Sequence, residues 1–136
     1  MSGGLCFPLY ACSREIIKRY TPFLEKIDLT YTQYIAMMVL WEKKQISVKE
    51  LGKCLFLDSG TLTPLLKKLE QKGYVTRTRS EEDEWVLIAA ITPKGEDLKD
   101  EAVLIPQKMM ACAALPQEKA AQLYTLLYRS EERRVG

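Results

Sequence analysis

The chain contains no histidine, and this absence excludes several kinds of active site at once. Ser-His-Asp and Cys-His nucleophile arrangements, imidazole-ligated zinc sites and the usual general base near neutral pH all need that side chain. Most hydrolase mechanisms are therefore excluded. We expect a protein that is not an enzyme and that holds neither a metal nor a cofactor.

Cysteine pairs and long apolar runs are missing as well. The four cysteines, Cys6, Cys12, Cys54 and Cys112, include no CxxC pair, which argues against a zinc cluster and against a disulfide-stapled secreted domain. No apolar run approaches the roughly 18 residues of a membrane span, and the N-terminus lacks the basic-then-apolar order of a signal peptide. We expect a cytoplasmic protein with no membrane partner.

The composition that is present describes one compact domain over residues 1–136. Of the 136 residues, 47% are hydrophobic, which allows a chain of this length to bury a substantial core. The 20 basic side chains are nearly balanced by 18 acidic ones, so the formal net charge is only +2. Attraction to nucleic acid must therefore come from where the charges lie and not from their total.

The first predicted helix covers residues 5–20. Its apolar residues recur every three or four positions, as they do on one face of an amphipathic helix. They are Leu5, Leu9, Cys12 and Ile16. We expect this face to pack in the core, which would make Cys12 a buried thiol, and we expect the same of Cys54.

Capping boxes open the next two predicted helices. Thr30 opens a helix over residues 31–42, and Ser47 opens a short helix over residues 48–54. The apolar residues that dominate the first of these are Ile35, Met38, Val39 and Trp41.

A fourth helix is predicted over residues 59–72, with Asp58 as its N-cap and Gly73 placed to end it. Its leucines recur at i, i+3, i+4 and i+7, so they form one core-facing stripe. They are Leu62, Leu65, Leu66 and Leu69.

After residue 73 the apolar period changes to two. Residues 74–79 and 85–91 are typical of strands, and the acidic residues 80–84 between them predict a hairpin with a polar tip. A short helix, a turn and a longer helix directly before a hairpin indicate a helix-turn-helix with a β-wing. The predicted fold is therefore mainly α with a small β-hairpin (α+β), with a DNA-binding lobe over residues 29–92 and its wing over residues 74–91.

The C-terminal part is predicted to be helical. Thr92 and Pro93 have the order of an N-cap and a first helical residue, and the helix should continue toward Ala113 with a kink at Pro106. A last helix begins at Pro116. From residue 129 onward the chain is mostly charged, which predicts a frayed tail.

The N-terminal turn of the fourth helix is the part expected to enter the major groove of double-stranded DNA. The candidate DNA-binding residues are the cap Asp58, the hydroxyls of Ser59, Thr61 and Thr63, the phosphate-reaching Lys67 and Lys68, and Arg77 and Arg79 on the wing. Taken alone, these residues have an ordinary structural explanation: the hydroxyls can cap the helix, and the lysines can lie on its solvent-exposed face. The complete order of elements favours DNA binding.

Four stretches of the chain, at residues 5–7, 29–34, 57–67 and 80–84, carry a family resemblance. They resemble the organic hydroperoxide resistance regulators (OhrR), a branch of the MarR family of winged-helix repressors, and are similar also to the staphylococcal SarZ and MgrA regulators. The likeness covers about residues 5–128. The stretch 57–67 is far more specific than a general helix-turn-helix pattern.

The resemblance implies a homodimer, built from terminal helices at about residues 5–28 and 93–128, that binds a pseudo-palindromic operator. It places the family's reactive cysteine on Cys6, and on Tyr20 and Tyr31 the two tyrosines that hydrogen-bond that cysteine across the dimer. Oxidation of the cysteine by an organic hydroperoxide would then release the DNA.

Two routes remain open after the first oxidation. Some relatives resolve the sulfenate with a second cysteine near the start of the last helix, and Cys112 lies about one turn before that position. Without such a bridge, a low-molecular-weight thiol would cap the sulfenate.

The spacing around Cys6 agrees with a special role. On a helix, Cys6, Tyr10 and Tyr20 share a stripe that is separate from the apolar face. A thiol in the first turn also meets unpaired backbone N–H groups and the positive end of the helix dipole, which favour the thiolate. Judged on its own, however, a cysteine is more often an idle or buried thiol.

The wing departs from the family at one residue. Its motif normally continues with an arginine that inserts into the minor groove, whereas Trp85 follows Glu84 here. An indole cannot replace a guanidinium among phosphates and A·T acceptors. We expect weaker binding that depends more on the major groove, unless Arg77 and Arg79 compensate.

Three other functions remain open. A MarR-type regulator could respond to a small aromatic or phenolic ligand, with Cys6 incidental and with release that needs no thiol. A peroxide-reducing enzyme could use Cys6 directly, although the chain lacks histidine and a Thr-x-x-Cys context. A winged-helix protein-interaction module would show no salt-dependent affinity for DNA.

Overall fold

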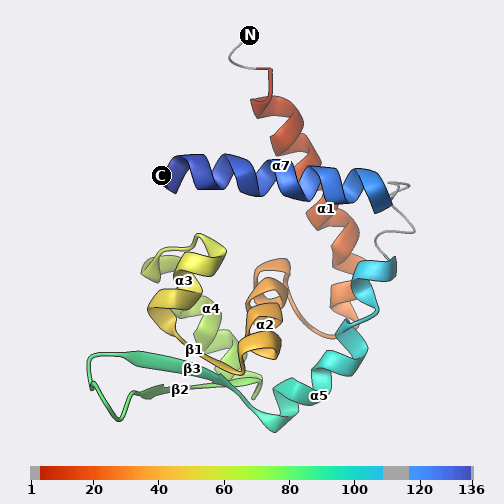
Figure 1. Cartoon of the computed structure of the whole chain (residues 1–136). Helices are drawn as coiled ribbons and strands as arrows, with labels where there is room; N and C mark the ends of the chain where they lie inside the picture. Colours follow the sequence, from red (N-terminus) through yellow and green to blue (C-terminus); the bar gives the residue numbers. More distant parts are fainter. Residues whose placement is uncertain (1–3, 109–116, 136) are drawn as a thin grey trace. The chain divides into compact units, whose positions relative to one another are not determined.

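The computed structural model describes residues 4–108 and 117–135 and divides into two compact units, Met1–Ile105 and Pro106–Gly136. The elements of the first unit are α1 (Cys6–Glu25), α2 (Tyr31–Lys43), β1 (Gln45–Ser47), α3 (Val48–Leu55), α4 (Ser59–Gln71), β2 (Val75–Arg79), β3 (Leu87–Ile91) and α5 (Pro93–Ala102) (Figure 1). The second unit contains α7 (Gln117–Val135). The chain is mainly helical with one small antiparallel sheet, as predicted.

The sheet has three strands in the order β1-β3-β2. Strands β2 and β3 are the predicted hairpin, and their pairing runs from Val75 opposite Ile91 to Arg79 opposite Leu87. Strand β1 pairs with the other edge of β3 and was not predicted. Three residues are too few to display a period of two, so only the pairing with a distant strand identifies β1.

Helix α4 follows the prediction closely. All four leucines of its stripe are buried, and α4 contacts α2, α3 and β2. Gly73 ends the helix at φ +84°, where its N–H donates to the Glu70 carbonyl at 2.9 Å and the N–H of Tyr74 donates to the Leu69 carbonyl at 3.0 Å. This pair of bonds is a Schellman motif, which a glycine in the left-handed region favours.

Helix α2 has the predicted start, and the apolar residues that dominate its sequence are only partly buried. Trp41 is buried, whereas Met38 is exposed and burial falls instead on Ala36, Met37 and Leu40. The helix is apolar on most sides, so its sequence does not select a face. The contacts with α4 and the sheet make that selection.

Helix α1 is longer than predicted. It continues through Pro22 to Glu25, and Leu24 near its end is buried in the core. A proline inside a helix removes one backbone hydrogen bond. Burial of Leu24, together with the hydrogen bond from the Thr21 hydroxyl to the Ile17 carbonyl at 3.2 Å, offsets that loss.

The predicted core face of α1 is not buried in the first unit. Leu5 is 73% exposed and Leu9 is 52% exposed. The expectation that Cys12 and Cys54 are buried thiols was wrong, because both are exposed. The described residues of this unit leave the apolar side chains of the N-terminal part of α1 exposed.

The C-terminal predictions need two corrections. Helix α5 ends at Ala102 and helical backbone resumes at Ile105, so Pro106 does not kink one continuous helix. The proline ring would clash with the carbonyl four residues earlier, that of Ala102. The expected frayed tail was also wrong, since the backbone of α7 remains helical to Val135, in a run rich in helix-forming Glu and Arg.

Within the part of the chain that the structure describes, no helix is long and apolar enough to span a membrane.

Candidate DNA-binding and redox site

The start of α4 is an exposed, capped helix end. Asp58 is the N-cap, and its Oδ1 accepts a hydrogen bond from the Thr61 N–H at 2.8 Å. Ser59 and Thr61 are exposed, and Thr63 is half-buried. The first turn of α4 therefore exposes backbone N–H groups beside side-chain hydroxyls, and both can bind an anionic or hydrogen-bonding partner.

The cap also changes the chemistry of Asp58. The hydrogen bond from the Thr61 backbone holds the pKa of Asp58 below its ordinary value, because it stabilises the carboxylate. Asp58 is therefore charged and occupied as a cap. The two residues of α4 that are predicted to bind phosphate, Lys67 and Lys68, are both exposed.

The turn before α4 depends on close backbone approach. Phe56, the C-cap of α3, lies in the left-handed region at φ +57°. A Cβ on the buried Gly52 would lie 2.9 Å from the Leu57 carbonyl oxygen, closer than such atoms pack. Gly52 therefore allows α3 and the turn to meet, and we did not identify it from the sequence.

The two wing arginines both contact other residues of the lobe. The Arg77 Nε lies 2.6 Å from Glu70 Oε1 on α4, and the Arg77 side chain is only 18% exposed. On β2, the Arg79 guanidinium donates to the Glu84 carbonyl at 2.8 Å. Arg77 thus holds the wing on α4, while Arg79 contacts the wing tip through one hydrogen bond and is exposed.

The wing tip presents an aromatic side chain among carboxylates. Trp85 is 84% exposed, and its backbone N–H donates to Asp83 Oδ1 at 3.0 Å. Trp85 lies in the tip loop and not in the strand predicted for it, because β3 begins at Leu87. Glu81, Glu82, Asp83 and Glu84 are all exposed. The tip therefore offers an indole and negative charge where phosphate contact would need a cation.

Cys6 is the first residue of α1 and its thiol is exposed. The N-cap Leu5 makes no side-chain capping bond, so no side chain of that residue satisfies the N–H groups of the first turn. Tyr20 is fourteen residues farther along the same helix. A rise of about 1.5 Å per residue puts the two roughly 21 Å apart, so the thiol of one chain cannot reach its own Tyr20.

The structure brings Tyr20 and Tyr31 together. Their rings meet edge to face with centroids 5.4 Å apart, joining α1 to the first residue of α2. Tyr34 continues the cluster at 5.8 Å from Tyr20, and Trp41 follows at 6.3 Å from Tyr34. The Trp41 indole N–H donates to the Gly95 carbonyl at 2.8 Å. We did not predict the part played by Tyr34, although its spacing of three from Tyr31 is a signal that could have found it.

Burial raises the pKa of Tyr20 above its ordinary value, and the neighbouring Tyr31 adds to the shift. Burial likewise raises the pKa of Tyr34 to about 12. These two hydroxyls therefore keep their protons at neutral pH and can serve as hydrogen-bond donors. Cys112, the candidate resolving residue, lies outside the residues that the structure describes.

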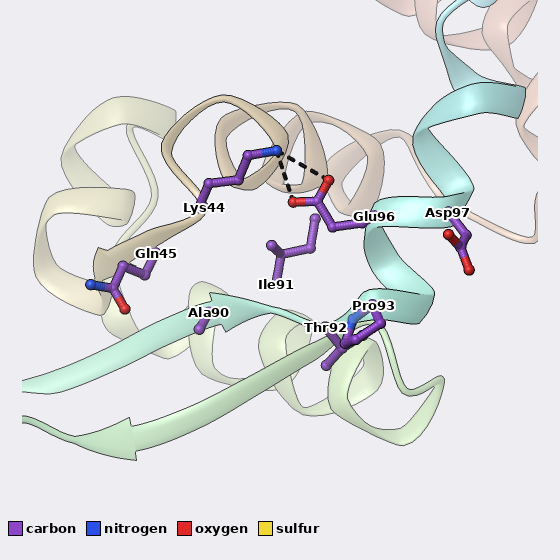
Figure 2. A pocket seen from close by; sticks show the side chains of 8 residues that line it. All are labelled: Lys44, Gln45, Ala90, Ile91, Thr92, Pro93, Glu96 and Asp97. Carbon is purple, nitrogen blue, oxygen red and sulfur yellow. Dashed lines mark hydrogen bonds and ion pairs between the residues drawn. The ribbon is translucent and has the colours of Figure 1, made fainter.

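A surface cavity of about 610 Å³ lies at the base of the wing (Figure 2). Figure 2 shows Lys44 and Glu96 facing each other across it, with Lys44 Nζ 2.8 Å from Glu96 Oε1. Ile91 and Pro93 supply apolar lining. Among the described residues no group of three or more His, Cys, Asp or Glu side chains could hold a metal ion.

Comparison with known proteins gives one family and several close relatives. The family described as transcriptional regulator SarA/Rot matches residues 18–102. The organic hydroperoxide resistance transcriptional regulator of Bacillus subtilis is 48% identical over 128 residues, which make up 94% of this chain and 87% of that protein. The HTH-type transcriptional regulator SarZ of Staphylococcus saprophyticus is 56% identical over 96 residues, 71% of this chain and 66% of that protein.

Solved structures of AbfR from Staphylococcus epidermidis are also similar. Reduced AbfR bound to DNA matches with a TM-score of 0.80 and 32% identity, over 99% of this chain and 94% of that one. Overoxidized AbfR bound to DNA matches with a TM-score of 0.79 and 33% identity, over 97% and 93%.

Proposed function

Because the chain belongs to the SarA/Rot family of transcriptional regulators and has the winged-helix fold of MarR-type proteins, we propose that it is a redox-sensing repressor of the OhrR branch. In this proposal a homodimer binds a pseudo-palindromic operator and leaves it when an organic hydroperoxide oxidises Cys6. The protein regulates transcription and acts in the cytoplasm, where the oxidant is a signal and not a substrate to be turned over.

The observation that carries the proposal is the placement of Cys6 relative to the tyrosine cluster. The exposed Cys6 thiol lies at the start of α1, and Tyr20, preformed against Tyr31 of α2, lies toward the other end of this amphipathic helix. One chain cannot join them, which agrees with the arrangement that the family resemblance implies, in which a second copy supplies the tyrosines that stabilise the thiolate. The sensing site is then completed only in the dimer, so a change at the thiol acts directly on the contact between subunits.

The oxidation step needs a thiolate and a hydroperoxide. The Cys6 sulfur attacks the terminal oxygen of ROOH, an S–O bond forms, the O–O bond breaks, and the alkoxide leaves and takes a proton to become the alcohol. Sulfur loses two electrons and the peroxide gains them. A second thiol, from Cys112 or from a small-molecule thiol, then forms an S–S bond with the sulfenic acid and releases water.

DNA binding is assigned to the start of α4. Ser59, Thr61 and Thr63 face the bases and Lys67 and Lys68 the phosphates, while Arg77 keeps the wing in place through Glu70. Two such helices in a dimer must match half-sites one DNA turn apart, about 34–36 Å. A rotation between subunits after oxidation would spoil this spacing.

The test is a fluorescence-anisotropy titration on the DNA upstream of the protein's own gene. Reduced protein should bind, and one equivalent of an organic hydroperoxide with a small thiol should release the DNA. The Cys6→Ser variant is the matched control and should bind equally well before and after oxidant. Release of Cys6→Ser by oxidant would contradict the assignment of Cys6, and binding that survives oxidation of the unaltered protein would contradict the redox mechanism.

Non-reducing electrophoresis separates the two routes to the disulfide. A disulfide-linked dimer that disappears in Cys112→Ser supports the two-cysteine route. Monomeric oxidised protein that carries a small thiol supports the one-cysteine route.

A second candidate function is favoured by the cavity at the base of the wing. Its volume of about 610 Å³ suits a small ligand, and Lys44 could exchange Glu96 for a ligand carboxylate. A phenolic carboxylate such as salicylate would then release DNA saturably from Cys6→Ser as well as from the unaltered protein. If the phenolic carboxylate does not release DNA but oxidation does, the ligand mechanism is excluded and only the redox mechanism remains.

A further inference from the structure

Lys72 lies where the DNA-reading helix meets the turn that leads into α2. It is the C-cap residue of α4, and its side chain is only 25% exposed. Its ammonium donates to the Asp28 carbonyl and to Gln33 Oε1 at 3.0 Å, and it lies 3.6 Å from Asp28 Oδ2. Two of the three ammonium donors therefore make hydrogen bonds, and the Asp28 carboxylate adds an ion pair.

The acceptors belong to the segment that fixes the backbone at Tyr31. Gln33 Oε1 also accepts from the Thr30 N–H at 3.1 Å, and the Gln33 N–H donates to Thr30 Oγ1 at 3.3 Å. Tyr31 lies between these two residues as the first residue of α2. Asp28, in the preceding turn, holds the left-handed conformation at φ +55°. Gln33 is buried, so the Lys72 contact cannot be exchanged readily for water.

The backbone of Lys72 is joined to the opposite side of the lobe. Its carbonyl accepts from Lys94 Nζ at 2.8 Å, and the neighbouring Gly73 carbonyl accepts from the Thr92 hydroxyl at 2.6 Å. Both donors lie at the start of α5, directly after the wing. Within the described residues, Lys72 is thus bound by its side chain to the Tyr31 turn and by its backbone to the wing base.

We propose that Lys72 is the positioning residue through which the state of the Cys6 site sets the orientation of α4. The inference rests on the proposed function. Oxidation of the partner subunit's Cys6 adds oxygen or a thiol group beside Tyr31 and displaces it. Since Tyr31 lies between Thr30 and Gln33, the two residues of the capping box, its displacement moves Gln33. The Lys72 ammonium, which is hydrogen-bonded to Gln33, moves with it and turns the end of α4.

The test compares two DNA affinities of one protein, reduced and oxidised, at low salt so that both can be measured. Their ratio reports coupling, whereas a purely structural defect lowers both affinities by the same factor. We expect Lys72→Met, which keeps most of the aliphatic stem, to lower the ratio by roughly threefold to thirtyfold. Its reduced form should bind DNA within a few-fold of the unaltered protein.

Lys94→Met is the matched control, because Lys94 reaches the same junction without touching the Tyr31 turn. Its ratio should equal that of the unaltered protein. Asp28→Asn is the second variant, to be used if Lys72→Met fails a thermal-unfolding check. It removes the carboxylate that pairs with Lys72 and keeps the backbone carbonyl acceptor. Asparagine also tolerates the left-handed backbone conformation of this position. We expect Asp28→Asn to lower the ratio by roughly twofold.

The outcomes are distinguishable. A lowered ratio in Lys72→Met or Asp28→Asn, with an unchanged ratio in Lys94→Met, supports the proposal. An unchanged ratio in the folded variants, or an equal loss in Lys94→Met, overturns it while the redox function stands. A ratio of one in the unaltered protein overturns the redox function and this inference with it.

Discussion

Helices α1 and α4 have the same kind of sequence and opposite surroundings. Each carries apolar side chains at i, i+3 or i+4, yet Leu66 on α4 is 0% exposed and Leu9 on α1 is 52% exposed. The leucines of α4 find α2, α3 and β2 in the same chain. The N-terminal part of α1 has no such cover among the described residues of its unit, and in the function proposed above a second copy of the chain covers this face.

The N-termini of α1 and α4 also differ in how they are capped. Helix α4 begins at a charged, capping Asp58, whereas α1 begins after Leu5 with no side-chain cap. A capped helix with its own core is stable within one chain, and an uncapped helix with an exposed face gains stability on association. The DNA-binding half therefore has its own core within one chain, while the sensing half is the part that we propose dimerisation completes.

The largest expected effect comes from truncating a buried leucine of α4. Leu66→Ala should lower the free energy of unfolding by about 2–5 kcal/mol, because it removes buried methyl groups and leaves a cavity. Leu9→Ala should lower it by less than about 1 kcal/mol, and only at protein concentrations where the dimer forms. Urea unfolding at two protein concentrations measures both. Equal and concentration-independent losses would contradict the contrast between the two helices.

A charge on the exposed face of α1 tests the partner directly. Ile16→Glu should raise the dimer dissociation constant by about a hundredfold, since an unpaired carboxylate would be buried at the interface. Lys18→Glu, on the opposite side of the helix, is the control and should change the constant by less than about threefold. Sedimentation equilibrium distinguishes the two. An unchanged dimer in Ile16→Glu would show that this face does not join the subunits.

The wing tip resembles α1 in one respect, because Trp85 is a large exposed apolar side chain. Trp85→Arg should tighten operator binding by about tenfold, since it supplies a cation among the tip carboxylates. The slope of log affinity against log salt concentration should become steeper by about one, as expected for one added phosphate contact. Trp85→Gln, which removes the indole without adding charge, should not tighten binding. Anisotropy titrations over a salt series give both values, and unchanged affinity in Trp85→Arg would refute the expectation.

The smallest effect concerns the cap of α4. The folded pKa of Asp58 is lowered, so its stabilisation is fully present above the ordinary pKa of an aspartate and is lost as the pH falls through the folded value. The difference in melting temperature between the unaltered protein and Asp58→Ala should therefore shrink from about pH 7 to about pH 3. Asp58→Asn caps without titrating and should show no such trend. A difference that is constant over this range would show that the carboxylate does not act as a charged cap.

Local signals made much of the lobe predictable. The caps Thr30, Ser47, Asp58 and Thr92 all accept the predicted hydrogen bonds, because a cap depends on residues only three positions apart. The stripe of α4 was predictable because one face alone is apolar. Tyr20 and Tyr31 came from the family resemblance, and their contact is now explained by the turn between α1 and α2.

The sequence by itself determined where most helices begin, which face of α4 is buried and where the hairpin lies, since each depends on side chains a few positions apart. Only the tertiary structure decided the rest. Strand β1 needs β3, the buried face of α2 needs its neighbours, and Arg77 is bound to Glu70 because the wing folds back on α4. Lys72 and Asp28 are 44 positions apart, and no local pattern predicts a contact that forms when the end of α4 packs beside the turn before α2.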